Sequence, residues 1–305
     1  MHYSVMLSEA IEGLNIKENG TYVDCTLGYA GHSSEILKRI NKGFLFAFDQ
    51  DMEAINSSKQ KLDKIGNNYH IFYSNFVNMK DKLKEKNIDK VDGILFDLGV
   101  SSPQLDEDSR GFSFHNDSTL DMRMDTSASL TAKQVVNTYS KEELIDIFFK
   151  YGEEKYARSI AEGIVKYRTT KEIETTLELV DIIKDNVPDK YKREKHPARK
   201  VFQALRIEVN NELEVFERAL KDALGLLSPN GRICVITFHS LEDRICKNIF
   251  SEVTKIDDTL KKLPVIPEEY LPDFKIVKVL EPSKEELERN NRARSAKLRV
   301  IEKIK

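Results

Sequence analysis

The chain has 305 residues, enough for one large domain or two modest ones, and its 40% apolar content can form a sizeable core. Because 48 Lys and Arg residues face 51 Asp and Glu residues, the formal net charge is only −3. This balance excludes a globally basic nucleic-acid binder but permits a local basic patch.

Cys25 and Cys234 lie in apolar runs, and the three cysteines of the chain show no CxxC pairing. This pattern predicts reduced, buried thiols and indicates neither a disulfide framework nor a zinc site. No apolar stretch approaches the roughly 18 residues that a membrane span requires. The N-terminus has polar and acidic breaks where a signal peptide needs an apolar core. We therefore expect a cytoplasmic protein with no membrane partner.

The first third of the chain alternates predicted helices and strands. The helical patterns occupy residues 7–14, 33–40 and 52–65. The predicted strands occupy residues 22–25, 44–48, 69–73 and 91–96. Near-continuous apolar strands separated by helices indicate an α/β fold with a mostly parallel sheet covered on both faces.

A long interval then interrupts this rhythm. Residues 98–231 precede the next convincing strand, 232–238, although a single crossover helix needs far fewer residues. The interval has its own helical patterns, and apolar spacing from Phe202 to Leu224 predicts one long helix that ends in a turn at 227–231. Two further strands are predicted at 274–279 and 297–301. We expect residues 105–215 to form an inserted helical subdomain for substrate recognition, and residues 1–104 and 216–305 to form the cofactor-binding domain.

Three predicted strands end on a carboxylate followed by a turn, at Asp24, Asp49 and Asp97. Residues just past the ends of parallel strands line the ligand crevice. Three acids there favour a ligand with hydroxyl groups and a positive charge, and S-adenosylmethionine has a ribose diol, an ammonium and a sulfonium. The turn after Asp24 could also belong to an NAD-type oxidoreductase, but it lacks the full GxGxxG pattern, and a carboxylate beside a pyrophosphate would be repelled. Asp24 could alternatively cap the following turn.

At this point the sequence resembles one family, the bacterial ribosomal RNA small-subunit methyltransferase H family, also called MraW. The matching segments are DCTLGYAGHS at Asp24, AFDQD at Ala47, VDGILFDLGVSSPQLD at Val91, RGFSF at Arg110, LDMRMD at Leu120, HPARKVFQALRIEVNNEL at His196, TFHSLEDR at Thr237 and NNRARSAKLR at Asn290. The resemblance implies a Rossmann-like class I methyltransferase fold. It also implies methyl transfer from S-adenosylmethionine to N4 of a cytidine in 16S ribosomal RNA near the decoding centre, in the small ribosomal subunit.

The same resemblance implies which residues contact the cofactor. They are Ala30, Gly31, His32, Asp49, Phe76, Asp97 and Gln104. Asp49 can accept hydrogen bonds from both ribose hydroxyls, and Gly31 avoids a β-carbon that would obstruct backbone approach. Phe76 could pack on the adenine, although a lone Phe is more often part of a core. His32 could also be an ordinary residue at a helix N-terminus.

The loop after Asp97 loosely resembles the Ser/Asn/Asp-Pro-Pro-aromatic segment of amino-methyltransferases. We expect Asp97, Ser101, Ser102 and His239 to be the catalytic candidates, because hydrogen-bond acceptors localise the lone pair of the cytosine amine. His239 could equally make a structural hydrogen bond. The second proline and the aromatic residue of that segment are missing, so Phe112 or Phe114 is the candidate for stacking on the base.

RNA contact should be local. A basic run extends from Lys190 to Arg206 and includes Lys192, Arg193, Lys195, Arg199 and Lys200, and residues 292–297 are also basic. A basic run can also be only a solvated face. The alternatives are an oxidoreductase, a non-catalytic RNA-binding factor, and a methyltransferase for DNA, protein or a small molecule. The sequence leaves the oligomeric state open, a homodimer included.

Overall fold

The computed structural model describes residues 4–101, 104, 110–194, 196–260, 264 and 266–305. The chain forms two compact units. The first, which we call the sheet unit, comprises residues 1–99 and 213–305, and the second, the helical unit, comprises residues 100–212.

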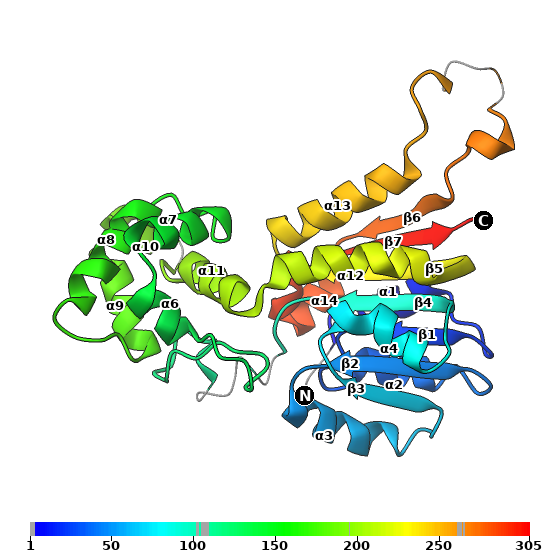
Figure 1. Ribbon diagram of the computed structural model, residues 1–305, viewed down its shortest axis with the longest axis horizontal. Helices are drawn as coiled ribbons and strands as arrows, with labels where there is room; N and C mark the ends of the chain where they lie inside the picture. Colours follow the sequence, from blue (N-terminus) through cyan, green and yellow to red (C-terminus); the bar gives the residue numbers. More distant parts are fainter. Residues whose placement is uncertain (1–3, 102–103, 105–109, 195, 261–263, 265) are drawn as a thin grey trace. The chain divides into compact units, whose positions relative to one another are not determined.

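The sheet unit contains a seven-stranded, mostly parallel sheet with the order β3-β2-β1-β4-β5-β7-β6 (Figure 1). Its strands are β1 (Thr21–Asp24), β2 (Phe44–Asp49), β3 (Tyr69–Tyr73), β4 (Val91–Asp97), β5 (Leu227–Thr237), β6 (Phe274–Leu280) and β7 (Lys297–Lys303). β7 pairs antiparallel with both β5 and β6, whereas the other pairs are parallel. The predicted Rossmann-like α/β fold is therefore confirmed.

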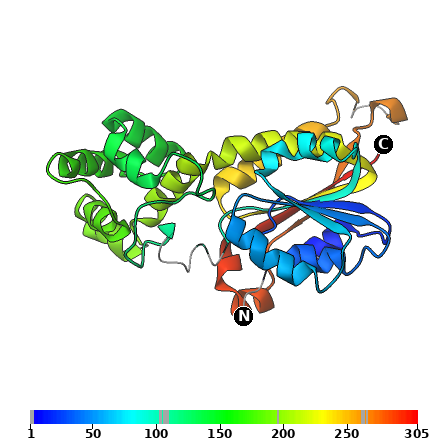
Figure 2. The ribbon, with the colours of Figure 1, turned by 60° about the horizontal axis from the view of Figure 1, so that its bottom comes forward.

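Helices cover both faces of this sheet, as Figure 2 shows. One face packs against α1 (Leu7–Leu14), α2 (Gly31–Leu37) and α3 (Met52–Leu62), and the other against α4 (Met79–Glu85), α12 (Glu212–Leu226) and α13 (Ser240–Thr254). Successive strand residues alternate between the two cores, so Leu95 faces the first and Ile94 and Phe96 face the second. Burial on both faces explains why these strands are apolar at nearly every position.

The parallel strands bring their carboxyl ends to one edge. β1 lies between β2 and β4, and its last residue, Asp24, is in register with Ala47 and Leu95. Asp49 and Asp97 each lie two residues beyond those partners, at the ends of β2 and β4. The three carboxylates therefore stand on adjacent strands.

The helical unit has its own apolar core. It contains α6 (Ala132–Thr138), α7 (Lys141–Lys150), α8 (Ala157–Arg168), α9 (Thr176–Asp185), α10 (Asp189–Glu194) and α11 (Arg199–Asn210). Capping boxes fix the starts of three of these helices, at Thr131, Ser140 and Thr175. In each box the side chains of the N-cap residue and of the residue three positions later satisfy one another's backbone N–H groups.

The prediction of one long helix from Phe202 to Leu224 is wrong. The segment consists of α11 and α12, which are separated at Asn211. Asn211 has a left-handed backbone with φ of 49°, a conformation that ends a right-handed helix and that asparagine tolerates better than most residues. Apolar spacing continues across this break, so periodicity alone could not reveal it.

The prediction of a separate turn at 227–231 is also wrong. These residues belong to β5, where Asn230 has φ of 64° and the pairing with β4 shifts register between Val91 and Gly93. The segment is thus an irregularity within the strand.

Several shorter elements were missed or differ in extent. The sequence analysis did not predict α4, and it extended the helix after β2 beyond its end at Leu62. The remaining elements are η1 (Phe76–Asn78), η4 (Glu268–Tyr270), α14 (Lys284–Arg289) and η5 (Asn291–Ser295). The cysteines are buried free thiols, as predicted for Cys25 and Cys234. Among the helices of the described residues, none has the length and apolar character to cross a membrane.

Gly43→Ala should destabilise the sheet unit. A β-carbon at Gly43 would lie 2.1 Å from the carbonyl oxygen of Gly20, so the backbone before β1 would have to move. We expect the free energy of unfolding to fall by roughly 1–3 kcal/mol. Gly225→Ala in α12 is the matched control, because its β-carbon meets nothing within 4 Å, and it should be neutral or stabilising by up to about 1 kcal/mol. If Gly43→Ala unfolds in urea at the same midpoint as wild type, this prediction is contradicted.

Candidate active site

The turn between β1 and α2 has a strained backbone that neighbouring groups hold in place. Gly28 and Ala30 are both left-handed, with φ of 49° and 56°. The N–H of Leu27 donates to the Phe48 carbonyl oxygen at 3.0 Å, and Ala30 is fully buried. A left-handed alanine costs about 1–2 kcal/mol relative to the right-handed form, so these contacts stabilise the turn in a conformation that it would not adopt alone.

Asp49 connects this turn to the end of β2. Its Oδ2 accepts a hydrogen bond from the Gly28 N–H at 2.8 Å, and its Oδ1 accepts one from the Asp51 N–H at 2.9 Å. Burial, assisted by the charge of Asp51, raises the pKa of Asp49 to about 6. The Gln50 N–H also donates to this carboxylate. A carboxylate has about four acceptor positions, so one remains for a ribose hydroxyl.

Asp24 is satisfied within the protein. It is fully buried, its Oδ2 accepts from the Ser33 hydroxyl at 2.6 Å, and its Oδ1 accepts from the Thr26 N–H at 3.0 Å. Burial raises the pKa of this carboxyl group. Both oxygens therefore secure the turn and the start of α2, which corresponds to the capping alternative that the sequence left open.

His32 and Asp97 face one another at the end of β4. His32 is 4% exposed, and its Nε2 lies 3.2 Å from the carbonyl oxygen of Val5. A carbonyl can only accept, so Nε2 carries the proton and Nδ1 presents a lone pair. Burial lowers the pKa of His32 to about 4, which keeps the ring neutral at pH 7. Nδ1 lies 3.5 Å from Asp97 Oδ2, and so it offers no proton to that oxygen.

Asp97 is the least satisfied acid at this edge of the sheet. Its Oδ1 is buried and has no hydrogen-bond partner among the described residues. Burial raises the pKa of Asp97 well above its usual range, and the charges of Asp24, Glu242 and Glu286 add to the effect. A buried acceptor without a partner is unfavourable by about 1–3 kcal/mol or more when charged. The site therefore fits a ligand that brings a positive charge or an N–H donor, and the ammonium of S-adenosylmethionine meets that requirement.

Two other predicted residues of the sheet unit have structural contacts. Phe76 is half-buried at the start of η1 and meets the Phe96 ring edge-on, with 5.6 Å between ring centroids. His239 is the N-cap of α13, and its Nδ1 accepts from the Glu242 N–H at 3.5 Å. Its Nε2 lies 3.0 Å from Glu242 Oε1 but in a geometry that makes no hydrogen bond. Their predicted functional roles remain predictions.

Gly31 is crowded by the chain itself, and its predicted contact with the cofactor remains a prediction. A β-carbon there would lie 1.7 Å from the Ser4 hydroxyl oxygen. The requirement for a small residue thus already follows from the chain's own packing, independent of any cofactor.

The remaining candidates belong to the helical unit. The Gln104 side-chain oxygen accepts from the Ser101 N–H at 3.0 Å, and the Ser101 hydroxyl accepts from the Gln104 N–H at 3.3 Å. Ser102 lies outside the described residues. Phe112 is 6% exposed and part of the core of the helical unit, which leaves little of its ring for stacking on a base, whereas Phe114 is half-buried.

Sequence reasoning missed three residues that shape the site. The Thr26 hydroxyl accepts from the Asp97 N–H at 2.8 Å, and Glu242 and Glu286 add negative charge near Asp97. The His239-to-Glu242 spacing resembles a capping box and could have identified Glu242. No local pattern links Glu286 to Asp97, because the electrostatic interaction between them depends on the fold.

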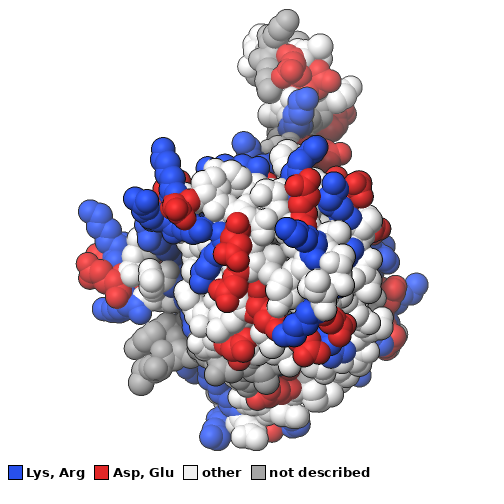
Figure 3. All heavy atoms as spheres, turned by 90° about the vertical axis from the view of Figure 1, so that its left-hand side faces the viewer, with Lys and Arg blue, Asp and Glu red and all other residues white. Residues whose placement is uncertain are grey.

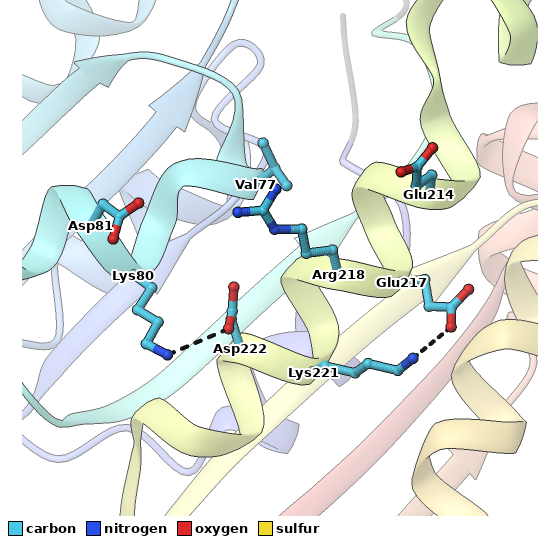
Figure 4. A pocket seen from close by; sticks show the side chains of 8 residues that line it. All are labelled: Val77, Lys80, Asp81, Glu214, Glu217, Arg218, Lys221 and Asp222. Atoms are coloured by element: carbon cyan, nitrogen blue, oxygen red, sulfur yellow. Dashed lines mark hydrogen bonds and ion pairs between the residues drawn. The ribbon is translucent and has the colours of Figure 1, made fainter.

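A surface hollow of about 620 Å³ lies elsewhere, between α4 and α12. Figure 4 shows its charged lining, in which Lys80 pairs with Asp222 and Lys221 pairs with Glu217. Its lining includes none of the predicted site residues. The strand ends are the stronger candidate for the active site, because a buried carboxylate oxygen there has no hydrogen-bond partner among the described residues.

Asp49→Asn should change the pH dependence of stability. Because the pKa of Asp49 is raised to about 6, the folded protein binds this proton at a higher pH than the unfolded chain does. Wild type therefore gains stability from Asp49 as the pH falls from 7 towards 4, and the asparagine variant lacks this gain. We expect urea unfolding to show that the free energy of unfolding of wild type, relative to that of the variant, is higher at pH 5 than at pH 7. A difference that does not change with pH would show that Asp49 has an ordinary pKa.

Comparison with known proteins identifies the family. A family model described as the MraW methylase family matches residues 1–304. The ribosomal RNA small subunit methyltransferase H of Finegoldia magna is 54% identical over 307 residues, which cover 99% of this chain and 98% of that protein. A crystal structure of an rRNA methylase from Streptococcus thermophilus is 10% identical with a TM-score of 0.47, covering 100% of this chain and 99% of that one. A protein from Streptococcus mutans solved in complex with SAH is 12% identical with a TM-score of 0.45 and full coverage of both chains. From the whole-length family match and the 54% identity, the chain belongs to the MraW methylase family of S-adenosylmethionine-dependent methyltransferases.

Proposed function

We propose that this methyltransferase modifies 16S ribosomal RNA of the small subunit, at N4 of a cytidine near the decoding centre, in the P site. The Finegoldia magna relative, whose name specifies ribosomal RNA of the small subunit, supports the substrate class. The observation that carries the proposed chemistry is the buried, unpartnered Oδ1 of Asp97 at the end of β4. The proposed substrate also implies a cytoplasmic location.

S-adenosylmethionine, when bound, supplies an electrophilic methyl group on its sulfonium. The residues that would hold it are Ala30, Gly31, His32, Asp49, Phe76, Asp97 and Gln104. Asp49 is suited to a hydroxyl group, since its two oxygens are fixed in direction by the N–H groups of Gly28 and Asp51. Asp97 is suited to a positive charge, because a nearby cation favours the ionised form that burial and neighbouring acids disfavour.

Asp97 can also serve the attacking amine. The N4 lone pair of cytosine is delocalised into the ring, and an acceptor for its N–H groups makes that lone pair more available. Oδ1 has a free acceptor position, and the Asp97 backbone is held by its N–H bond to the Thr26 hydroxyl. As the N–C bond forms, the C–S bond would break and release a neutral thioether, and the amine proton can leave after the transfer. Because a sulfonium methyl is a strong electrophile, we expect orientation of the amine rather than a strong general base to supply most of the acceleration.

The RNA contacts are proposed to lie on the basic run of the helical unit, with corrections from the structure. Lys200 Nζ donates to the Glu153 carbonyl oxygen at 2.5 Å, and Arg206 forms a bidentate ion pair with Glu212 at 2.7 and 2.9 Å. These two cations are therefore engaged within the protein, and Lys195 lies outside the described residues. Lys190, Arg193 and Arg199 are exposed and remain the best candidates for phosphate contacts.

Charge on the face drawn in Figure 3 is mixed rather than concentrated. Figure 3 shows Lys and Arg side chains interspersed with Asp and Glu. In the C-terminal basic segment, Lys297 lies 3.6 Å from Asp243 and is thus partly neutralised. We therefore expect a modest number of phosphate contacts.

The proposed function is tested by isolating small ribosomal subunits from a strain that lacks the gene and incubating them with the purified enzyme and isotopically labelled S-adenosylmethionine. Mass spectrometry of the digested RNA should find the label in N4-methylated cytidine. Label in another base, or none in RNA, would contradict the proposed site or the proposed substrate.

Asp97→Asn should impair methyl transfer more than cofactor binding. An amide has about the same size as a carboxylate but offers one acceptor oxygen and introduces donors that would face the substrate N–H groups. We expect kcat to fall by about a hundredfold or more, as for the loss of one preorganised electrostatic contact. Single-turnover methylation at saturating cofactor and RNA, with calorimetry of cofactor binding, measures both effects.

Asp92→Asn is the control for that experiment. Asp92 lies near the opposite end of β4, where its Oδ2 accepts from the Thr21 N–H at 2.9 Å. This variant should transfer methyl groups at the wild-type rate once it is saturated. If Asp97→Asn also does so, Asp97 acts in binding alone.

Replacing Lys190, Arg193 and Arg199 with glutamine should weaken RNA binding and make its salt dependence shallower. Each lost phosphate contact reduces the slope of log K against log salt by about 0.7 for single strands, so the three together should reduce it by up to about 2. Cofactor affinity should not change. The control replaces Lys141 of α7, Lys166 of α8 and Lys171 of the segment after α8, which removes the same charge from other parts of the same unit. Equal slopes for the two triple variants would mean that the run is only a solvated face.

A further inference from the structure

Four aromatic rings of the helical unit form a cluster that we call the ring cluster: Phe114, His115, His196 and Phe202. Phe114 stacks on His196 with 4.5 Å between centroids and 23° between planes, and His115 meets both rings at 4.5 and 5.4 Å. Phe202 of α11 contacts Phe114 edge-on at 5.6 Å. Two segments that are distant in the sequence are thus joined through their rings.

Exposure decreases across the cluster from one side to the other. Phe202 is 3% exposed and belongs to the core of the helical unit, whereas Phe114 and His196 are half-buried and His115 is exposed. The buried side anchors the rings, so their positions are set by the core. The exposed side leaves ring surface available to a planar ligand.

Cations lie near His196. Burial, His115 and Lys184 of α9 lower the pKa of His196, in that order, so Lys184 is within electrostatic reach of the ring, although it also pairs with Asp181 at 3.7 Å. Arg199 begins α11, and its N–H donates to the His196 carbonyl oxygen at 3.2 Å. Arg193, near the end of α10, and Arg199 make no ion pair with any described residue. Ring faces beside unpaired cations are the combination that binds unpaired nucleotides, with bases on the rings and phosphates on the cations.

We propose that the ring cluster is a stacking platform for an unpaired nucleotide of the RNA substrate. This inference rests on the proposed function, because it assumes that the substrate is RNA. It assigns the cluster a task that the charged residues cannot perform: cations bind paired and unpaired strands alike, whereas a ring face selects bases that are free to leave their stack.

The test compares two RNAs with matched composition, an unpaired oligonucleotide and a blunt-ended duplex. Phe114→Leu removes the ring but keeps an apolar side chain against Phe202. Its affinity for the unpaired RNA should fall between about fivefold and a hundredfold, the range for loss of one stacked base. Its affinity for the duplex should change less than twofold. The salt slope should stay at the wild-type value, since no charge is removed. Fluorescence anisotropy at several salt concentrations measures all of these quantities.

Phe149→Leu is the matched control. Phe149 of α7 is 69% exposed in the same unit and is outside the ring cluster, so this variant should bind both RNAs as wild type does. His115→Ala provides a second variant, because His115 is exposed and its loss should not disturb the core. His115→Ala should also weaken binding of the unpaired RNA, so the inference can be tested even if Phe114→Leu fails to fold.

The outcomes separate this inference from the proposed function. If wild type methylates ribosomal RNA but His115→Ala and any folded Phe114→Leu protein bind unpaired RNA normally, the stacking platform is wrong and the proposed function stands. An equal loss of affinity for the unpaired and paired RNAs would also overturn the platform. If wild type neither binds nor methylates RNA, both proposals fail.

Discussion

The burial of one carboxylate close to other carboxylates is the constraint on which the site depends. A parallel sheet aligns the ends of its strands, and in this protein the strands β1, β2 and β4 each end on aspartate. Asp97 lies in the field of Asp24, Glu242 and Glu286, and its Oδ1 has no partner among the described residues. Folding provides enough free energy to hold this arrangement, but the arrangement itself is unfavourable until a donor or a cation reaches Asp97.

The neighbouring acids differ in how far the protein satisfies them. Ser33 and Thr26 donate to Asp24, and the N–H groups of Gly28 and Asp51 donate to Asp49. These bonds also maintain the left-handed backbone at Gly28 and Ala30. Asp24 therefore contributes to the rigidity of the turn, Asp49 contributes to rigidity and keeps acceptor capacity, and Asp97 keeps the greatest capacity for a ligand. Because Asp24 and Asp49 hold the turn in place while Asp97 keeps a free acceptor, a charged ligand can bind without rearrangement of the backbone.

The two compact units have different physical characters. The sheet unit concentrates negative charge at buried strand ends, a feature that favours a cationic cofactor and disfavours a polyanion. The helical unit carries exposed Lys190, Arg193 and Arg199 and a ring cluster anchored by Phe202. Its helices begin at capping boxes and pack on a separate core. On the proposed function, methyl transfer and RNA recognition therefore draw on separate sets of residues, and substitutions in one set should leave the other intact.

Much of the fold follows from local sequence patterns. Apolar runs between helical patterns predicted the parallel strands, and each of the four N-terminal strands ends within one residue of its predicted end. Such patterns report burial, because a residue that faces a core must be apolar wherever it lies. They do not report backbone handedness, and for this reason the break at Asn211 between α11 and α12 was missed. The residues at 227–231 have the composition of a turn, yet they lie within β5, where Leu227 and Arg232 on either side of the irregularity pair with Val91 and Gly93 of β4.

The sequence by itself determined the family, the α/β fold and the acids at the strand ends, because these depend on residue type and on spacing along the chain. Only the tertiary structure decided what each acid does. It satisfied Asp24 internally, left Asp97 Oδ1 without a partner, brought Glu286 near Asp97, and stacked Phe114 on His196. It also showed that Lys200 and Arg206 of the basic run are engaged within the protein. The physical reason is that a hydrogen bond, a pKa or a ring contact depends on which groups meet in space, and those groups come from distant parts of the chain.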